Sequence, residues 1–260
     1  MVERWNGTRW SIGATPNPVG IAVSGLAGVH CPNATFCVAV GSYFMNSPDS
    51  SLERTLVEQW NGTSWRIVAS PNRPGVTDNG LTGVSCVSAT DCTAVGHYRN
   101  DLGTRTLVER WNGTKWSIVA SPNPGGVAQS ELTGVTCRSA TSCFAVGSGH
   151  GTLVERWNGT SWSLMTTPNP AGTSSASLTS ISCPGATRCF AVGDFFGSSN
   201  VQRLVEVWNG AAWSITSTPA PAGTISSGFS GVSCGGTVNC FAVGEYSSGT
   251  SRRPLIERFS

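Results

Sequence analysis

Short apolar runs alternate with polar turns along the whole chain, and the alternation recurs about every fifty residues. One repeat contains four runs of strand length, at residues 132–137, 143–147, 153–157 and 160–165. A polar loop, a glycine or an Asn-Gly pair separates the runs. This pattern predicts an all-β chain in which each repeat supplies four short antiparallel strands.

Five cysteines give the period of the repeat. The spacings between Cys31, Cys86, Cys137, Cys183 and Cys234 are 55, 51, 46 and 51 residues. Self-similarity on this scale is typical of propellers and solenoids, whose repeats bury their apolar faces against one another. Because the repeat is unbroken, we expect residues 1–260 to form a single β-propeller domain of five approximately 51-residue repeats.

Proline and glycine indicate the order of the strands in a blade. A proline such as Pro168 follows the fourth run, and it suits the end of an outer strand because it cannot donate to a ladder. Gly134 in the first run suits a crowded, innermost strand. We therefore expect the strands to lie in chain order, with the fourth outermost.

The Asn-Gly pair at residues 158–159 predicts a two-residue type I′ hairpin turn. In that register Trp157 pairs with Thr160, and Glu155 pairs with Trp162. The two Trp rings would then lie diagonally across the hairpin, with the Glu side chain beside both.

Counting the runs predicts the number of blades. There are five strands each of types one, two and four, and six of type three. Twenty strands make a five-bladed β-propeller of four-stranded antiparallel blades, closed by pairing residues 8–12 with the C-terminal strands. One third strand, residues 2–5 or 255–259, is then surplus. An array cut from a larger propeller is the alternative.

The motifs resemble known repeats over the whole chain. A strand ending in Gly, a variable loop, a strand with a central Glu, a tight turn and a Trp resemble a kelch-type propeller blade. The sequences ERWNGTxWSxxxSPNP and LxGVSCxSATxCxAVG are similar to repeats of exported, mostly uncharacterised bacterial proteins. The resemblance implies four-stranded blades around an axis. The chain departs from kelch in having one Gly after the second strand and in its cysteines, and the resemblance implies no catalytic residue.

All ten cysteines occur as C-x5-C pairs around a polar loop between two apolar runs. The pairs are Cys31/Cys37, Cys86/Cys92, Cys137/Cys143, Cys183/Cys189 and Cys234/Cys240. Cysteines across a hairpin lie within disulfide reach, so we expect five local disulfides, each stabilising by about 2 kcal/mol. Zinc is the alternative, although His30, His97 and His150 share no repeat position. Disulfides imply an extracellular or cell-surface protein, whose signal peptide is not in this chain.

Composition excludes some classes of partner. Charged residues make up 12% of the chain and the net charge is +2, so a basic surface for nucleic acid is not expected. No apolar run is long enough to span a membrane. We expect no cofactor and no metal site, although calcium at the loops stays open.

The loops after the second and fourth strands share one rim. The loops after the second strand differ in every repeat, at residues 42–55, 97–106, 148–152, 194–203 and 245–254. Variation on a rigid scaffold is typical of a binding face. Four repeats place an aromatic residue alike at this rim: Tyr43, Tyr98, Phe195 and Tyr246. They could stack on sugar rings, or they could simply cap the ends of the blades.

Carboxyl groups fall into two sets. The six third-strand glutamates are Glu3, Glu58, Glu109, Glu155, Glu206 and Glu257. Repetition places them in like surroundings, so we interpret them as structural, accepting bonds from Trp N–H or nearby backbone groups. Asp194 and Glu245 occupy equivalent rim positions in consecutive repeats and could form the acid pair of a glycosidase, about 5–10 Å apart.

The leading hypothesis is a non-enzymatic recognition or scaffold propeller, lectin-like, that binds glycan or protein through the variable rim loops. One alternative is a glycoside hydrolase or lyase that uses Asp194 and Glu245. Another is an architectural repeat segment of a larger surface protein. The chain is expected to be a monomer or a strand-swapped dimer.

Overall fold

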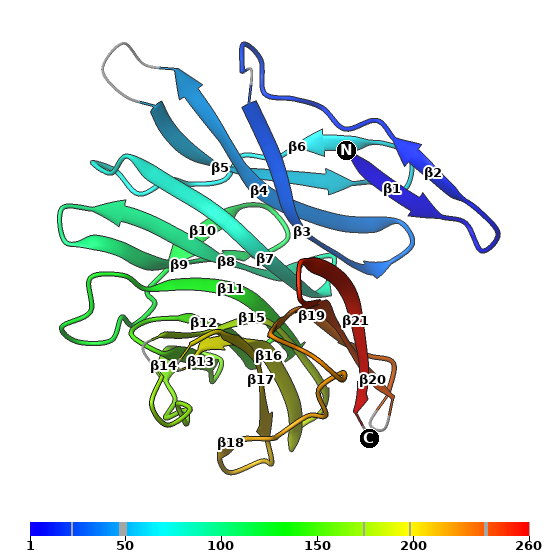
Figure 1. Ribbon diagram of the computed structural model, residues 1–260. Coiled ribbons are helices and arrows are strands. Elements are labelled where there is room, and N and C mark those ends of the chain that lie inside the picture. Colours follow the sequence, from blue (N-terminus) through cyan, green and yellow to red (C-terminus); the bar gives the residue numbers. More distant parts are fainter. Residues whose placement is uncertain (22, 47–50, 174, 198, 237–238, 260) are drawn as a thin grey trace. The chain divides into compact units, whose positions relative to one another are not determined.

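The computed structural model describes residues 1–260 except 22, 47–50, 174, 198, 237–238 and 260. Part of the rim loop predicted at residues 42–55 therefore lies outside the described residues. Within the described ranges every regular element is a β-strand. The contacts divide the chain into two compact units, Met1–Ala120 and Ser121–Ser260, and each is described by itself (Figure 1).

Unit 1 contains three antiparallel sheets in its described residues. The first is a hairpin of β1 (Val2–Trp5) and β2 (Trp10–Gly13). The second contains β3 (Val23–Asn33), β4 (Phe36–Asn46), β5 (Ser51–Trp60) and β6 (Trp65–Ile67). The third contains β7 (Asp78–Ser88), β8 (Asp91–Asn100), β9 (Gly103–Trp111) and β10 (Trp116–Val119).

The described residues of unit 2 contain three more antiparallel sheets. They are formed by β11 (Glu131–Ser139), β12 (Ser142–Ser148), β13 (Thr152–Trp157) and β14 (Trp162–Leu164); by β15 (Ser175–Gly185), β16 (Arg188–Phe196), β17 (Val201–Trp208) and β18 (Trp213–Ile215); and by β19 (Ser226–Cys234), β20 (Cys240–Ser248) and β21 (Ser251–Phe259). Strands lie in chain order, so the fourth strand is at the sheet edge, as predicted.

The predicted closure of the ring is not among the described pairings. Residues 8–12 were expected to pair with the C-terminal strands, but β2 pairs with β1 through all four of its residues. The last sheet therefore has three strands, and the described residues form six sheets where five complete blades were expected. A closed five-bladed ring remains a prediction.

The Asn-Gly hairpin differs from the predicted two-residue turn. Trp157 lies opposite Trp162, and Glu155 lies opposite Leu164, so the loop has four residues. The reason is the side chain of Asn158, whose Oδ1 accepts hydrogen bonds from the backbone N–H groups of Thr160 and Ser161 at 2.9 Å each. An Asx turn thus replaces the type I′ turn. The Trp rings are direct cross-strand neighbours, with centroids 5.7 Å apart.

All five predicted disulfides are formed, each across the hairpin between the first and second strands of a sheet. The bonds are Cys31–Cys37, Cys86–Cys92, Cys137–Cys143, Cys183–Cys189 and Cys234–Cys240. The described residues contain no free cysteine, so the zinc alternative for these pairs is wrong. The cysteines stabilise the hairpins and hold no metal ion.

The cysteines on the second strands are deeply placed. The second cysteine of every pair is buried: Cys37, Cys92, Cys143, Cys189 and Cys240. Each of these cysteines lies on the second strand, which pairs with both the first and the third strands of its sheet. These five side chains belong to the core and contribute no group to a ligand site.

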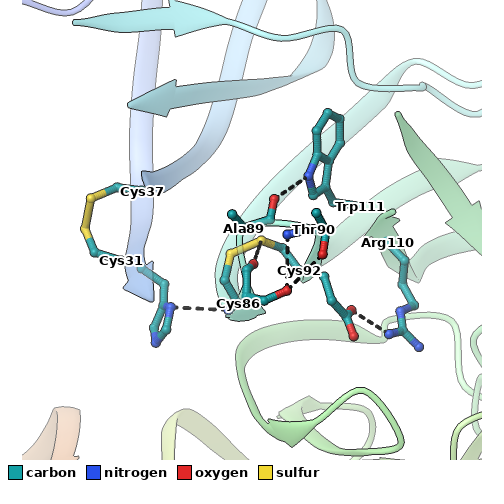
Figure 2. Close-up of a disulfide and its surroundings, with 11 residues drawn as sticks. Cys31, Cys37, Cys86, Ala89, Thr90, Cys92, Arg110 and Trp111 are labelled. Atoms are coloured by element: carbon teal, nitrogen blue, oxygen red, sulfur yellow. Dashed lines mark hydrogen bonds and ion pairs between the residues drawn. A yellow bond between two sulfur atoms is a disulfide. The ribbon is translucent and has the colours of Figure 1, made fainter. Parts of the chain in front are cut away.

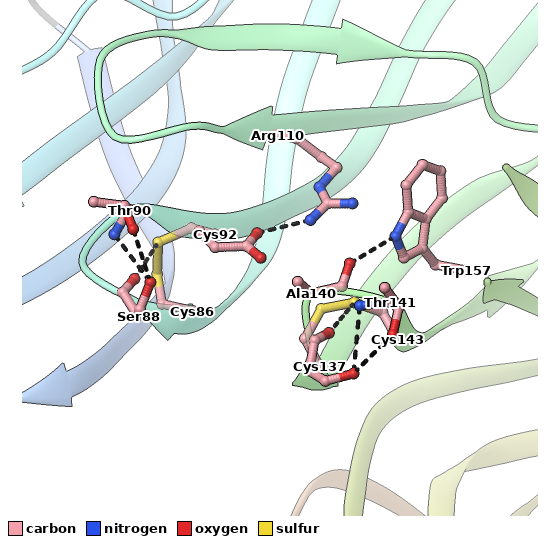
Figure 3. Close-up of polar contacts among 12 residues, drawn as sticks. Cys86, Ser88, Thr90, Cys92, Arg110, Cys137, Ala140, Thr141, Cys143 and Trp157 are labelled. Carbon is pink, nitrogen blue, oxygen red and sulfur yellow. Dashed lines mark hydrogen bonds and ion pairs between the residues drawn. A yellow bond between two sulfur atoms is a disulfide. The ribbon is translucent and has the colours of Figure 1, made fainter. Parts of the chain in front are cut away.

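The disulfide loops also hold the third strands in place. Trp111 donates its indole N–H to the carbonyl of Ala89 at 3.1 Å (Figure 2), and Trp157 donates to that of Ala140 at 3.0 Å (Figure 3). Each acceptor lies between the two cysteines of its repeat. A loop that the disulfide closes therefore anchors the end of the third strand.

Glycine ends the second run in every repeat because the first strand passes very close. A Cβ atom built on Gly147 would overlap the carbonyl oxygen of Glu131. The first strand is bulged between Leu132 and Gly134, which brings this carbonyl toward the second strand. The same overlap occurs at Gly41, Gly96, Gly193 and Gly244. The residue that follows each of these glycines is thus placed alike at the sheet rim.

Candidate functional site

A cavity of about 370 Å³ in unit 2 brings together the two rim acids. Asp194 reaches it from β16 and Glu245 from β20. Tyr246 and Arg252 also line it, beside Gly228 of β19. We call this space the acid cavity.

Gly228 keeps the space between the two acids open. A Cβ atom on Gly228 would lie 3.3 Å from Asp194 Oδ2, so the carboxyl group of Asp194 lies directly over this glycine. Gly228 is the cross-strand partner of Glu245, and directly opposed residues present their side chains on the same face. Since opposed Cβ atoms are about 5 Å apart, the Asp194 carboxyl group lies within about 9 Å of the Glu245 Cβ atom.

The surroundings of the two acids differ. Asp194 is half-buried, and burial raises the pKa of its carboxyl group; the Ser177 hydroxyl, 3.4 Å from Oδ1, acts in the opposite direction. Glu245 is more exposed and forms an ion pair with Arg252, whose Nη1 lies 2.8 Å from Oε1. Burial thus favours the protonated form of Asp194, whereas Glu245 lies beside the positive charge of Arg252. Acid–base chemistry requires two carboxyl groups in such unlike surroundings.

A second cavity, of about 600 Å³, adjoins the first and shares Val201 and Ser227 with it. Phe195 lines this second cavity, as Tyr246 lines the acid cavity. Both rings are half-buried and pack against the cores of their sheets. In unit 2 the aromatic positions therefore both cap the sheets and face a cavity.

The other two rim aromatics belong to unit 1. Tyr43 and Tyr98 are half-buried, and Tyr98 packs against the core there. The guanidinium of Arg73 lies over the Tyr98 ring, 4.4 Å from its centroid. This contact occupies one face of the Tyr98 ring with protein.

Two of the third-strand glutamates accept bonds from hydroxyl groups, where bonds from Trp N–H or nearby backbone groups were predicted. Ser70 donates to Glu109 at 2.8 Å, and Ser121 donates to both oxygens of Glu155, at 3.0 and 2.9 Å. Each hydroxyl belongs to the Ser-Pro-Asn motif of the preceding repeat. That recurring motif was the sequence signal for these partners.

Burial makes three of these glutamates weaker acids than usual. Burial raises the pKa of Glu109 and of Glu155 to about 8, and that of Glu206 to about 7. Each side chain is fully buried, and its carboxyl group is most stable when protonated. Glu257 differs because Arg203 forms an ion pair with it at 3.1 Å.

Sequence reasoning missed one pair at the rim of unit 1. His97 occupies the rim position equivalent to Asp194 and Glu245, and its Nε2 lies 3.5 Å from Oε2 of Glu53. The hydrogen bond from His97 holds the pKa of Glu53 below its usual value. Glu53 lies outside the repeated motifs, so no pattern indicated it.

Two negative findings apply to the described part of the chain. No group of three or more His, Cys, Asp or Glu side chains there is arranged to hold a metal ion. No helix there is long and apolar enough to cross a membrane.

No known protein family matches this sequence, and no curated protein matches it. Solved structures do match. One is YCF48 from Cyanidioschyzon merolae, with 12% identity and a TM-score of 0.55 over 93% of this chain and 73% of that one. Another is a polysaccharide lyase of family PL25, an ulvan lyase bound to -[GlcA(1-4)Rha3S]-, with 9% identity and a TM-score of 0.56 over 87% of this chain and 65% of the lyase.

A glycoside hydrolase of the GH130 family is a more distant match, with 6% identity and a TM-score of 0.46 over 90% of this chain and 82% of that one. The two stronger likenesses show a fold of the β-propeller type. The kelch type of blade and the kinship with exported bacterial repeats remain predictions.

These comparisons correct the leading hypothesis of a non-enzymatic recognition or scaffold propeller. One of the two stronger likenesses is to a polysaccharide lyase, which is an enzyme, so the preference for a non-enzymatic chain was wrong. The sequence argument preferred recognition because it could not tell whether Asp194 and Glu245 share a cavity, which they do.

Proposed function

We propose that this chain is a carbohydrate-active enzyme that cleaves a glycosidic bond in the acid cavity. The observation that carries the proposal is the pair Asp194 and Glu245, which lie on one face of one cavity in unlike surroundings. The likeness to a polysaccharide lyase supports the same class of substrate.

Hydrolysis uses the two carboxyl groups in different roles. Asp194, whose pKa is raised by burial, donates its proton to the glycosidic oxygen as the bond from that oxygen to the anomeric carbon breaks. Glu245, which is paired with Arg252, accepts a proton from the water that attacks the anomeric carbon. The Tyr246 ring lines the same cavity and offers an apolar surface to a sugar ring.

Elimination is the second candidate, and Arg252 is the observation that favours it. Its guanidinium lies at the cavity and could bind the carboxylate of a uronic acid in the fork geometry that arginine offers. In that reaction a base removes the proton beside the carboxylate and the glycosidic oxygen leaves with a proton from Asp194. The product carries a new carbon–carbon double bond, whereas hydrolysis adds water.

We also propose where the protein is located and which type of blade it contains. Five disulfides support a protein of an oxidising, extracellular or cell-surface compartment. The strand order and the Asn-Gly hairpin with its two Trp residues support a kelch-like blade.

The test is cleavage of a panel of neutral and uronate-containing polysaccharides, read by new reducing ends and by the absorbance of unsaturated uronate. Asp194→Asn and Glu245→Gln should each lower kcat/KM by about 10²–10⁴-fold. Asp101→Asn changes an exposed acid of unit 1 and should leave the rate unchanged. Rates equal to that of the unaltered chain in both cavity variants would reject the proposal.

A further inference from the structure

Two sheet faces of this chain are exposed, although the equivalent faces of other repeats are buried. One is the Trp face of the β1–β2 hairpin, where Trp5, Trp10 and Ile12 are 49%, 65% and 71% exposed. The equivalent Trp208 and Trp213 of the β15–β18 sheet are 3% and 6% exposed. The hairpin therefore presents a large apolar surface that the repeat normally covers.

The other exposed face belongs to the last sheet. Phe241, Val243 and Ile256 are 46%, 47% and 68% exposed. They share one face because Phe241 and Val243 are two apart on β20, and Ile256 lies opposite Val243 on β21. In the β11–β14 sheet the equivalent Phe144 and Val154 are 6% and 0% exposed.

Inside unit 2, faces of these two kinds pack against each other. The ring centroid of Phe144 lies 5.5 Å from that of Trp208 and 5.7 Å from that of Trp213. Val146 and Val154 belong to the same cluster as Leu204 and both Trp side chains. A Phe–Val face against a Trp face is therefore the interface that holds consecutive sheets together.

We propose that the Phe241 face of one copy of this chain binds the Trp5–Trp10 hairpin of a second copy. The repeat identifies the binding partner. Phe241 is equivalent to Phe144 in the repeat, and the two hairpin Trp residues are equivalent to Trp208 and Trp213. The hairpin docks intact, with its β1–β2 pairing preserved. The contact is heterologous, so it joins copies head to tail.

The test measures mass in solution over a range of concentrations by sedimentation or light scattering. The unaltered chain is expected to associate as its concentration rises. Trp10→Ser and Phe241→Ser each remove one of the two faces and should weaken association at least about tenfold. Both side chains are exposed, so both variants should fold; Phe196→Ser, at an exposed ring outside both faces, is the matched control and should associate like the unaltered chain.

Mixing the two variants gives the sharper result. The Trp10→Ser chain keeps its Phe241 face and the Phe241→Ser chain keeps its Trp face, so an equal mixture should form dimers and nothing larger. A chain that stays monomeric at every concentration would overturn the proposal, as would single variants that associate as strongly as the unaltered chain or a mixture that fails to pair.

Discussion

The carboxyl groups of the third strands and those of the rim cavity are the same chemical group in two different regions. Glu109 and Glu155 are fully buried, and each accepts a hydrogen bond from a hydroxyl group of the preceding repeat. Asp194 and Glu245 lie at the rim, where one is half-buried and the other forms an ion pair. Repetition gives Glu109 and Glu155 like surroundings, although the prediction of like surroundings fails at the two ends of the repeat, where Glu3 is exposed and Glu257 pairs with Arg203. Departure from the repeat produces unlike surroundings in the second region.

The difference teaches where chemistry can arise in a repeat protein. A position that every repeat fills alike gives several equal groups, which suits packing. The position after the second-strand Gly is held just as rigidly, yet it carries Ser42, His97, Ser148, Asp194 and Glu245 in the five repeats. A rigid backbone position at which the residue type can vary is well suited to a functional site.

The largest expected effect is the loss of a buried glutamate. Glu155→Ala removes the acceptor of the Ser121 hydroxyl and leaves a cavity at a fully buried position, so the free energy of unfolding should fall by about 2–4 kcal/mol. Urea unfolding measures it. Glu245→Ala is the matched control, since its side chain is exposed and its loss should change stability little. Equal effects of the two changes would remove the distinction between the regions.

The pH dependence of stability should also come from the buried region. Burial raises the pKa of Glu109 to about 8, well above the value of 4.5 expected in the unfolded chain. Its contribution is therefore complete below pH 4.5 and is lost as pH rises through 8, at about 1.4 kcal/mol per pH unit. Glu109→Gln cannot ionise, so it should reduce that slope by one proton.

Unfolding free energies at several pH values between 5 and 9 measure this slope. Glu206→Gln is the internal comparison, because the pKa of Glu206 is raised only to about 7 and its contribution should level off at lower pH. A slope that is the same in Glu109→Gln and in the unaltered chain would show that Glu109 ionises normally in the folded state.

Much of the fold could be predicted because local rules set it. The pairing of Cys137 with Cys143 follows from a hairpin with a short polar loop, and the edge position of the fourth strand follows from proline. The Asn158 hairpin was predicted incorrectly, because the Asn side chain can cap a four-residue loop as well as enter a two-residue turn. The same Asn-Gly sequence is compatible with the two-residue turn and with the four-residue loop.

The candidate site was only half predictable for a similar reason. Equivalent positions in consecutive repeats identified Asp194 and Glu245. Whether their side chains share an open cavity depends on Gly228, a residue of the sheet after that of Asp194, because a Cβ atom there would crowd the Asp194 carboxyl group. No pattern indicated the ion pair of Glu245 with Arg252 or the burial of Asp194, because both depend on how strands pack together in the folded chain.

Filling the gap between the acids should reduce activity and leave stability almost unchanged. In Gly228→Ala the new Cβ atom would lie 3.3 Å from Asp194 Oδ2 and would displace the carboxyl group by a few tenths of an ångström. The rate of glycan cleavage should fall about tenfold, since acid catalysis depends on position. Gly231→Ala on the same strand gives an ordinary 3.5 Å contact with Val243 and is the control. Unchanged kcat/KM in Gly228→Ala would place the reacting groups elsewhere.

The smallest effect should be a shift in the pH–rate profile. Asp194 acts as the acid only while protonated, so activity should decline as pH rises through its raised pKa. The Ser177 hydroxyl stabilises the ionised carboxylate, so Ser177→Ala should raise the pKa further and move the basic limb of the kcat/KM profile to higher pH. Ser247→Ala changes another hydroxyl that lines the cavity and should leave the limb in place. If the basic limb moved to lower pH in Ser177→Ala, the group that titrates there would not be a carboxylic acid kept protonated by burial. The roles of Asp194 and Glu245 would then have to be exchanged.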